Sequence, residues 1–248
     1  MIEHAQAARI ADAAGRLLLA LRQRLGAHGV TVDGLRDEAD RRSHRLIVDA
    51  LVAAFPDDAV LSEEGKDDPV RLGARRLWIV DPLDGTREFA EPGRTDWAVH
   101  VAFLADGRLQ AGAVALPARS LLLSTAAPPV LAPRPPATPL RLAVSRTRPP
   151  DVTEAIRSAL GAELVPMGSA GAKTMAVVRG EVDVYAHAGG QYEWDSAAPV
   201  AVAGAAGVHV SRLDGAPLRY NQPDPWLPDL LVCRPELAGT VMAAAAHG

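Results

Sequence analysis

Cysteine is almost absent from this chain, and its scarcity limits both covalent and metal chemistry. Cys233 is the single cysteine among 248 residues, so no disulfide can form within the chain, as expected in a reducing compartment. The 7 histidines are scattered and lack the cysteine–histidine spacing of a zinc site. We therefore assign no chemistry to Cys233 and no ligand role to any histidine, each of which we expect at the surface or in a hydrogen bond.

Long apolar runs, excess positive charge and aromatic residues are also lacking. Because no run of about 18 apolar residues occurs, we expect no membrane-spanning helix, and early acidic residues argue against a signal peptide. The net charge of −4 argues against a nucleic-acid polymer as partner. Aromatic residues make up only 4% of the chain, so the core must consist mainly of small and aliphatic side chains. A cytoplasmic protein that acts on small molecules fits these features.

The most informative stretch is an apolar run that ends in two acids. Residues 77–80 predict a buried strand, and Asp81 and Asp84 follow it. Because Pro82 cannot extend a hydrogen-bonded ladder, we expect the strand to stop at Asp81. A glycine and a threonine come next and offer backbone N–H groups. This layout suits hard cations with a phosphate resting against them, although Asp-Gly is also a common turn dipeptide.

Two further acidic sites occur at the ends of predicted elements. Glu63 and Glu64 end a strand predicted at residues 59–64, which would place them beside the acids described above. Asp195 precedes an apolar helix predicted at residues 195–206, either as an ordinary N-cap or as a carboxylate at the edge of the core. Crowded carboxylates repel one another unless protons or cations intervene. Mg²⁺ prefers such oxygen ligands, so the acids together predict a magnesium site.

The remaining pattern predicts two halves of different architecture. Six prolines lie within residues 128–139, a composition that favours polyproline II, and we place a boundary there between residues 1–138 and 139–248. Strands and helices alternate beyond it, which predicts a parallel or mixed sheet. We expect helices at 3–25, 37–54, 151–160, 170–179 and 195–206, and strands at 59–64, 77–81, 97–105, 109–116, 120–126, 140–145, 163–167 and 182–187. The ranges 97–105 and 109–116, which flank Asp106-Gly107, are expected to form an antiparallel hairpin.

Three motifs together resemble the inositol-monophosphatase-like superfamily of Mg²⁺-dependent, lithium-sensitive phosphatases. They are Glu63-Glu64, Asp81-Pro82-Leu83-Asp84-Gly85-Thr86 and Trp194-Asp195-Ser196-Ala197-Ala198. The continuation Gly-Thr-Arg-Glu-Phe resembles the 3′(2′),5′-bisphosphate nucleotidase branch of the actinobacterial type, whereas inositol phosphatases usually have Gly-Thr-Thr-Asn-Phe. The resemblance covers most of the chain. It implies an α/β protein with an αβαβα layered sandwich, in which the N-terminal half is α+β and the C-terminal half is α/β.

By motif position, the resemblance implies two or three Mg²⁺ ions per active site. Glu63, Asp81 and the Leu83 carbonyl would bind one ion. Asp81, Asp84 and Asp195 would bind a second ion. Glu63 would also share in a third, weaker site.

The same resemblance implies where the substrate binds. Backbone N–H groups of Gly85 and Thr86 would hold the phosphate, and Arg87 would either meet a second phosphate or lie at the surface. The turn at residues 168–173 would either contact the ribose or 5′-phosphate or simply connect a strand to a helix. The candidate substrate-binding residues are Gly85, Thr86, Arg87, Gly168, Ser169 and Lys173.

The candidate catalytic residues are Thr86, Glu63 and Asp40, which would accept a proton from the attacking water. Many members of the superfamily carry Ser-Pro-Val-Thr-x-Ala-Asp after the first helix, and this chain does not. Residues 36–40 read Arg-Asp-Glu-Ala-Asp instead. Either Asp40 or Asp37 therefore takes the place of the final acid of that motif.

The implied reaction removes the 3′-phosphate of adenosine 3′,5′-bisphosphate to give AMP and phosphate. Phosphoadenosine phosphosulfate is expected as a second substrate, with a role in sulfur assimilation. One alternative is an inositol monophosphatase or a fructose-1,6-bisphosphatase with the same metals. Another is a nucleotide and metal sensor without turnover. A homodimer is expected by analogy with relatives alone.

Overall fold

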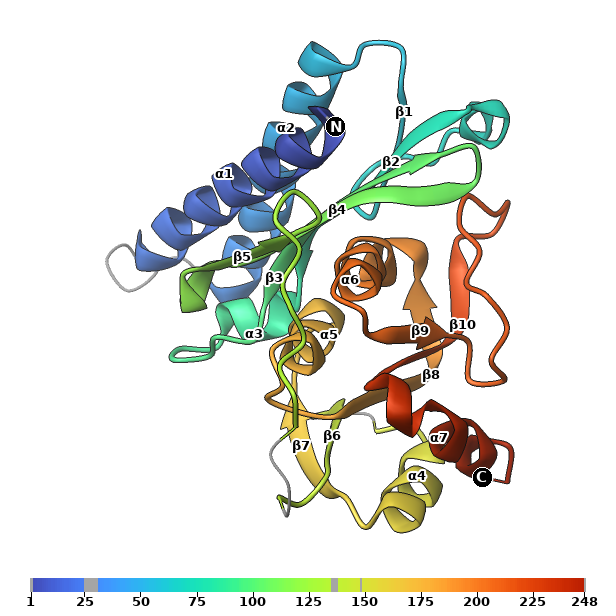
Figure 1. The fold of residues 1–248 in the computed structure, drawn as a ribbon. Coiled ribbons are helices and arrows are strands. Elements are labelled where there is room, and N and C mark those ends of the chain that lie inside the picture. Colours follow the sequence, from blue (N-terminus) through green and yellow to red (C-terminus); the bar gives the residue numbers. More distant parts are fainter. Residues whose placement is uncertain (1, 25–30, 135–137, 148, 248) are drawn as a thin grey trace.

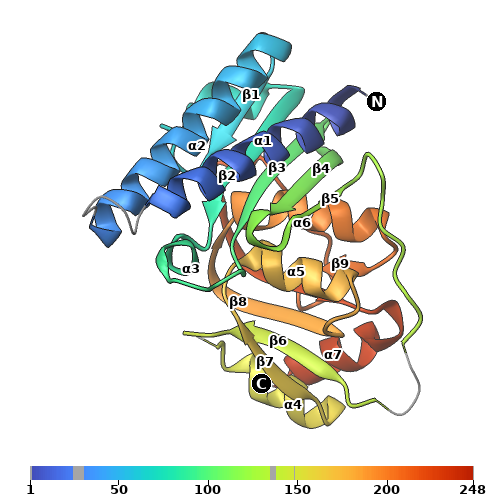
Figure 2. The same cartoon turned by 90° about the vertical axis from the view of Figure 1, so that its left-hand side faces the viewer.

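Layers of helices and sheets alternate in this protein, from α1 and α2 on one side to α4 and α7 on the other (Figures 1 and 2). The computed structural model describes residues 2–24, 31–134, 138–147 and 149–247. Between the outer helices lie a first sheet, a middle layer with α5 and α6, and a second sheet. The αβαβα sandwich implied by the sequence is confirmed.

The first sheet has five strands in the order β1-β2-β3-β4-β5. Their bounds are Ala59–Ser62, Arg76–Asp84, Ala98–Ala105, Arg108–Leu116 and Leu121–Ser124. β1 runs parallel to β2, and the other neighbours are antiparallel, so the predicted hairpin is confirmed as β3–β4. The helices α1 (Ile2–Arg24) and α2 (Val32–Ala54) cover one face.

The second sheet is mixed, as predicted, with five strands in the order β7-β6-β8-β10-β9. The strand bounds, from β6 to β10, are Arg141–Ser145, Glu163–Met167, Val184–Tyr192, His209–Ser211 and Trp226–Cys233. The helix bounds, from α3 to α7, are Thr86–Ala90, Val152–Leu160, Ala170–Val178, Glu193–Ala205 and Ala238–Ala245. Short 3₁₀ helices occupy Pro69–Gly73, Pro117–Arg119 and Pro235–Leu237.

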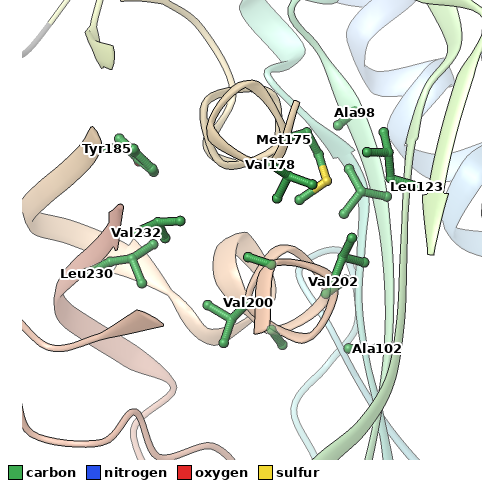
Figure 3. Close-up of a cluster of buried hydrophobic side chains, with 14 of the residues drawn as sticks. Ala98, Ala102, Leu123, Met175, Val178, Tyr185, Val200, Val202, Leu230 and Val232 are labelled. Carbon is green, nitrogen blue, oxygen red and sulfur yellow. The ribbon is translucent and has the colours of Figure 1, made fainter. Parts of the chain in front are cut away.

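Alternation along β2 explains why the first sheet has a core on both faces. Leu77 and Ile79 pack toward α5 and α6, whereas Trp78 and Val80 pack toward α1 and α2, because successive strand residues point to opposite faces. Figure 3 shows the core between the two sheets, which consists mainly of small and aliphatic side chains. Gly112 on β4 permits this close packing, since a Cβ atom there would lie 2.7 Å from the Cβ atom of Ala201.

Several predicted boundaries were wrong, among them the end of the strand predicted at 182–187, which runs to Tyr192 as β8. β2 does not stop at Asp81 but continues past Pro82 to Asp84, with an irregular register to β3 between the two acids. The proline therefore interrupts the ladder without ending the strand. The helix predicted from residue 37 begins at Val32, where the Thr31 side chain accepts a hydrogen bond from a backbone N–H and caps it.

The first sheet ends before the proline-rich stretch and the second begins after it. Pro135 and Pro136, two of the prolines that define this stretch, lie outside the described residues, as does residue 25 of the first predicted helix. The division into residues 1–138 and 139–248 stays a prediction. Within the described part of the chain, every helix is too short or too polar to cross a bilayer.

Candidate active site

Acids from three separate motifs converge beside the end of β2. Because β1 and β2 are parallel, their ends meet, and the Glu63 backbone N–H donates to the Val80 carbonyl 3.3 Å away. This contact brings the Glu63 carboxyl within hydrogen-bonding reach of Asp81. Asp195, in the first turn of α6, comes close enough to interact electrostatically with Asp81. The side chains that the sequence predicted as metal ligands therefore share one region.

Burial and mutual repulsion raise the pKa values of three of these acids. Loss of water contact, together with the charge of Asp84, raises the pKa of Glu63 to about 7. The same two causes raise the pKa of Asp195 to about 7. Burial, followed by the charges of Glu63 and Asp84, raises the pKa of Asp81 well above its ordinary value. The cluster carries more negative charge than it can hold without protons or cations.

The pKa of Asp84 is lowered instead of raised, because several hydrogen-bond donors hold its carboxylate. Its Oδ2 atom accepts hydrogen bonds from Ser169 Oγ at 2.6 Å and from the Gly171 backbone at 2.7 Å. Burial alone would raise its pKa, but these donors and His100 together lower the pKa to about 2. Asp84 is therefore a fixed, ionised group that links the end of β2 to the start of α5.

His100 is a member of this cluster that sequence reasoning missed. It is fully buried on β3, with Nε2 3.2 Å from Asp84 Oδ2 and Nδ1 3.1 Å from the Trp194 carbonyl. Ligand atoms of Asp81, Asp84 and His100 all lie within 4.8 Å of one another. The only signal for this placement is the strand pairing, which sets His100 opposite Asp81.

The turn after Asp84 has the geometry that its residues predict. Gly85 has a φ of 86°, a left-handed conformation that favours glycine. Thr86 begins α3, and its hydroxyl donates to the Leu83 carbonyl at 3.1 Å. A Cβ atom on Gly85 would lie 3.2 Å from the Cβ atom of Ser169. The turn thus packs closely against the start of α5.

Asp40 and Asp37 both lie on α2, but their surroundings differ. α2 is tied to β2 by Ser43 Oγ, which donates to the Pro82 carbonyl at 2.7 Å. Burial, and then the charge of Glu64, raises the pKa of Asp40 to about 7. Asp37 is exposed. Asp40 is therefore the acid of this pair that lies near the Glu63-Glu64 motif.

A cavity of about 200 Å³ adjoins the acidic cluster on the side of α3. Its lining includes each of the candidate substrate-binding residues and adds Glu88, Ser145, Arg146, Thr147 and Met167. Sequence reasoning missed Arg146, which directly follows β6. Another cavity, of about 250 Å³, lies between α1 and the β4–β5 edge, away from the acids, and we assign it no function.

Most backbone N–H groups of the turn at 168–173 already have partners within the protein. The Gly168 N–H donates to Asp96 Oδ2 at 2.6 Å, and the Ala170 N–H donates to Asp84 Oδ1 at 3.2 Å. Buried Lys173 donates from Nζ to the carbonyls of Gly168 and Ser169, at 3.2 and 2.8 Å. The turn joins the two halves of the chain around the acids as well as lining the cavity.

Known proteins of one family are similar to this chain in sequence. The model of a family described as the inositol monophosphatase family matches residues 2–129 and 135–246. A Mycobacterium leprae protein named 3′-phosphoadenosine 5′-phosphate phosphatase is 52% identical over 96% of this chain and 91% of its own length. The 3′(2′),5′-bisphosphate nucleotidase CysQ of Escherichia coli K12 is 32% identical over 76% of this chain and 80% of its own.

Solved structures with the same fold include two bacterial proteins. CysQ from Bacteroides thetaiotaomicron superposes with a TM-score of 0.79 at 28% identity, covering 93% of this chain and 96% of that one. Inositol monophosphatase II from Staphylococcus aureus superposes with a TM-score of 0.81 at 20% identity, covering 98% and 92%. The second likeness, at this low identity, supports the fold alone.

Proposed function

The chain belongs to the inositol monophosphatase family, and on this premise we propose that it is a Mg²⁺-dependent phosphatase acting on adenosine 3′,5′-bisphosphate. The products are AMP and phosphate. The observation that carries the proposal is the convergence of Glu63, Asp81, Asp84 and Asp195 beside a cavity with cationic side chains. The name of the relative at 52% identity supports the choice of substrate.

The donor set fits magnesium. Its ligand atoms are carboxylate oxygens, which Mg²⁺ prefers to imidazole nitrogen, and the raised pKa values of Glu63 and Asp195 reflect uncompensated negative charge. Glu63, Asp81 and the Leu83 carbonyl would hold one ion, and Asp81, Asp84 and Asp195 a second. Glu63 would share in a third. Mg²⁺ held there would supply charge neutralisation for the phosphate, which favours attack by water.

The residues of the chain itself orient the reaction. Backbone N–H groups of Gly85 and Thr86 bind a phosphate oxygen at the turn before α3. The Thr86 hydroxyl gives its hydrogen to the Leu83 carbonyl, so its oxygen accepts a hydrogen bond from the attacking water. That water forms the new bond to phosphorus as the bond to the 3′-oxygen breaks, and the departing 3′-oxygen takes a proton from solvent water.

The proton of the water passes to a carboxylate near the Glu63-Glu64 motif. Glu63 and Asp40 both have a pKa of about 7, which suits a general base at neutral pH. A bound cation lowers the pKa of its own ligands. Asp40 lies outside the proposed ligand sets, so bound Mg²⁺ would lower its pKa less than that of Glu63. Asp40 is therefore the better proton acceptor of the two.

The test is a phosphate-release screen with Mg²⁺, with and without lithium. The substrates are adenosine 3′,5′-bisphosphate, phosphoadenosine phosphosulfate, inositol 1-phosphate and fructose 1,6-bisphosphate. We expect the highest kcat/KM for the adenosine bisphosphate, and inhibition by lithium. A tenfold preference for the inositol or fructose ester, about 1.4 kcal/mol in the barrier, would show that the substrate is wrong. Nucleotide binding without phosphate release would favour the sensor alternative.

Several sequence-based expectations accompany this proposal. They are activity on phosphoadenosine phosphosulfate, a role in sulfur assimilation, a homodimer, a cytoplasmic location and the domain boundary near residue 138.

A further inference from the structure

The cavity beside the acidic cluster is lined by three cationic side chains, Arg87, Arg146 and Lys173, and by one carboxylate, Glu88. Ser169 belongs to both regions, because it lines this cavity and donates to Asp84. A ligand with a phosphate at the Gly85–Thr86 turn would therefore extend past these three cationic side chains. Such a space suits a second anionic group.

The geometry of Arg146 is that of a prepared anion-binding group. Its backbone N–H donates to the Met167 carbonyl at 3.1 Å, which anchors it between β6 and β7. Its Nη2 atom donates to Glu88 Oε1 and to Glu91 Oε2, both at 2.8 Å. Its Nε atom is buried and has no hydrogen-bond partner in the described part of the chain. Two carboxylates thus hold the Nη2 atom of the guanidinium, while Nε still needs an acceptor.

The packing around Glu88 fixes the position of the carboxylate that binds Arg146. Glu88 is buried on α3, and a Cβ atom on Gly168 would collide with its side chain. The absence of a side chain at Gly168 lets Glu88 reach Arg146 in the lining of the cavity. The arrangement brings together α3 from the first half of the chain and the ends of β6 and β7 from the second.

The other groups on this side of the cavity are less suited to bind an anion. Lys173 already donates to two carbonyls. Most N–H groups of the turn at 168–173 bind carboxylates or other atoms of the protein, including those of Gly168 and Gly171. Arg87 is exposed, so ordering its long side chain on a ligand costs conformational entropy.

We infer that Arg146 is a specificity-determining residue that binds the second, non-reacting phosphate of the substrate. The enzyme therefore selects esters that carry two phosphates on different carbons over esters that carry one. This inference rests on the proposed function, because it assumes that the reacting phosphate lies at the Gly85–Thr86 turn. The simpler alternative is that Arg146 only joins α3 to β6 through its ion pairs.

The experiment compares two substrates in the full chain with Mg²⁺. Phosphate release is measured for adenosine 3′,5′-bisphosphate and for adenosine 3′-monophosphate, in the wild type, Arg146→Met and Arg146→Lys. Arg157→Met is the matched control, because Arg157 also pairs with a glutamate but lies on the exposed face of α4. Unfolding temperatures of each variant show whether the fold is retained.

We expect Arg146→Met to lower kcat/KM for the bisphosphate by roughly 10- to 100-fold, the range for a lost charge-assisted hydrogen bond. The loss should lie mainly in KM, with the monophosphate changed less than threefold. The kcat/KM of Arg146→Lys for the bisphosphate should lie between those of the wild type and Arg146→Met, because lysine keeps the charge without the planar guanidinium. Arg157→Met should match the wild type. Equal losses for both substrates, or none for either, would overturn the inference.

A binding measurement separates this inference from the proposed function. AMP keeps the 5′-phosphate that Arg146 should hold, whereas adenosine lacks it. Calorimetric titration should show that Arg146→Met weakens AMP binding roughly tenfold or more and leaves adenosine binding unchanged. If the wild type releases no phosphate from either ester, the proposed function fails. If AMP binds the wild type and Arg146→Met equally, the present inference fails.

Discussion

Buried acids occur in two regions of this molecule, and their partners differ. Asp183, just before β8, is buried with Arg234 Nε 3.2 Å from its Oδ1 atom and the Arg141 backbone N–H 2.8 Å from its Oδ2 atom. At the end of β2, buried Asp81 faces the carboxyls of Glu63 and Asp84 instead. The first acid is compensated within the chain and the second is not.

This contrast shows that burial alone does not mark a metal site. A buried carboxylate with its own arginine contributes to the fold, and removal of either partner leaves an unpaired charge. A buried carboxylate among other carboxylates costs stability until a cation arrives. The two regions should therefore respond in opposite ways to neutral substitutions, to metal removal and to pH.

The largest effect is expected for Asp81→Asn. Loss of a ligand proposed to hold two ions should lower phosphate release roughly 1000-fold or more, the scale of several kcal/mol of transition-state stabilisation. The free energy of unfolding in EDTA should stay the same or rise, because one repelling charge is gone. Urea unfolding and phosphate release, measured on the same preparation, check both parts. If Asp81→Asn unfolds at a much lower urea concentration than the wild type, the proposed difference between Asp81 and Asp183 is wrong.

Asp183→Asn should show the reverse pattern. The buried Arg234 guanidinium would lose its charged partner, at a cost of about 3 kcal/mol in the free energy of unfolding. Activity per folded molecule should stay near that of the wild type, because Asp183 lies outside the acidic cluster. Urea unfolding curves with and without Mg²⁺ provide the measurement. A stable but inactive Asp183→Asn would show that the two regions are not separate.

A smaller effect is expected from displacing His100. A methyl group at Gly171 would collide with Nε2 of His100, so Gly171→Ala should disturb Asp84 although alanine favours helices. We expect both His100→Ala and Gly171→Ala to weaken Mg²⁺ binding roughly tenfold, as for other residues that orient metal ligands. Calorimetric Mg²⁺ titration measures this directly. Gly239→Ala on α7, where a Cβ atom meets nothing within 4 Å, is the matched control.

The smallest effect concerns pH. In the folded protein the pKa of Glu63 is raised from 4.5 to about 7, and that of Asp195 from 3.8 to about 7. Between about pH 4 and 7 the folded state therefore binds more protons than the unfolded state, so these groups make stability fall as pH rises. Asp84, with its lowered pKa of about 2, has the opposite effect, but only below about pH 4.

The measurement is the unfolding temperature between pH 5 and 8, with EDTA and with Mg²⁺. With EDTA, the wild type should lose a few degrees as pH rises through this range. Mg²⁺ should remove most of that loss, because it binds the folded ionised cluster. A pH dependence that is the same with and without Mg²⁺ would show that the acids at the end of β2 do not bind the ion.

Local patterns predicted most of the elements but not all of them. The apolar periodicity of α1 and the alternation of β3 and β4 are present in short windows of sequence, so these elements were found. β9, β10 and α7 were not predicted. Pro228 interrupts β10, and the strand tolerates it at the register shift between Leu227 and Asp229, where no regular ladder is required.

The site residues, like the elements, were predicted only where a local sequence pattern marked them. Glu63, Asp81 and Asp195 were found because each stands at the end of a predicted element within a motif. His100 and Arg146 were missed because neither stands in a motif of its own. His100 gains its place only when β3 pairs with β2, and Arg146 only when the end of β6 meets α3.

By itself, the amino-acid sequence determined which chemical groups stand at the ends of which strands and helices. It also determined that oxygen ligands, rather than sulfur or imidazole, would dominate any metal site. The tertiary structure alone decided which charges are compensated. Coulomb energy depends on distance through space and on burial, and neither can be read from separation along the chain. That is why Asp183 and Asp81, both acids beside apolar strands in the sequence, became a structural ion pair and a member of the acidic cluster.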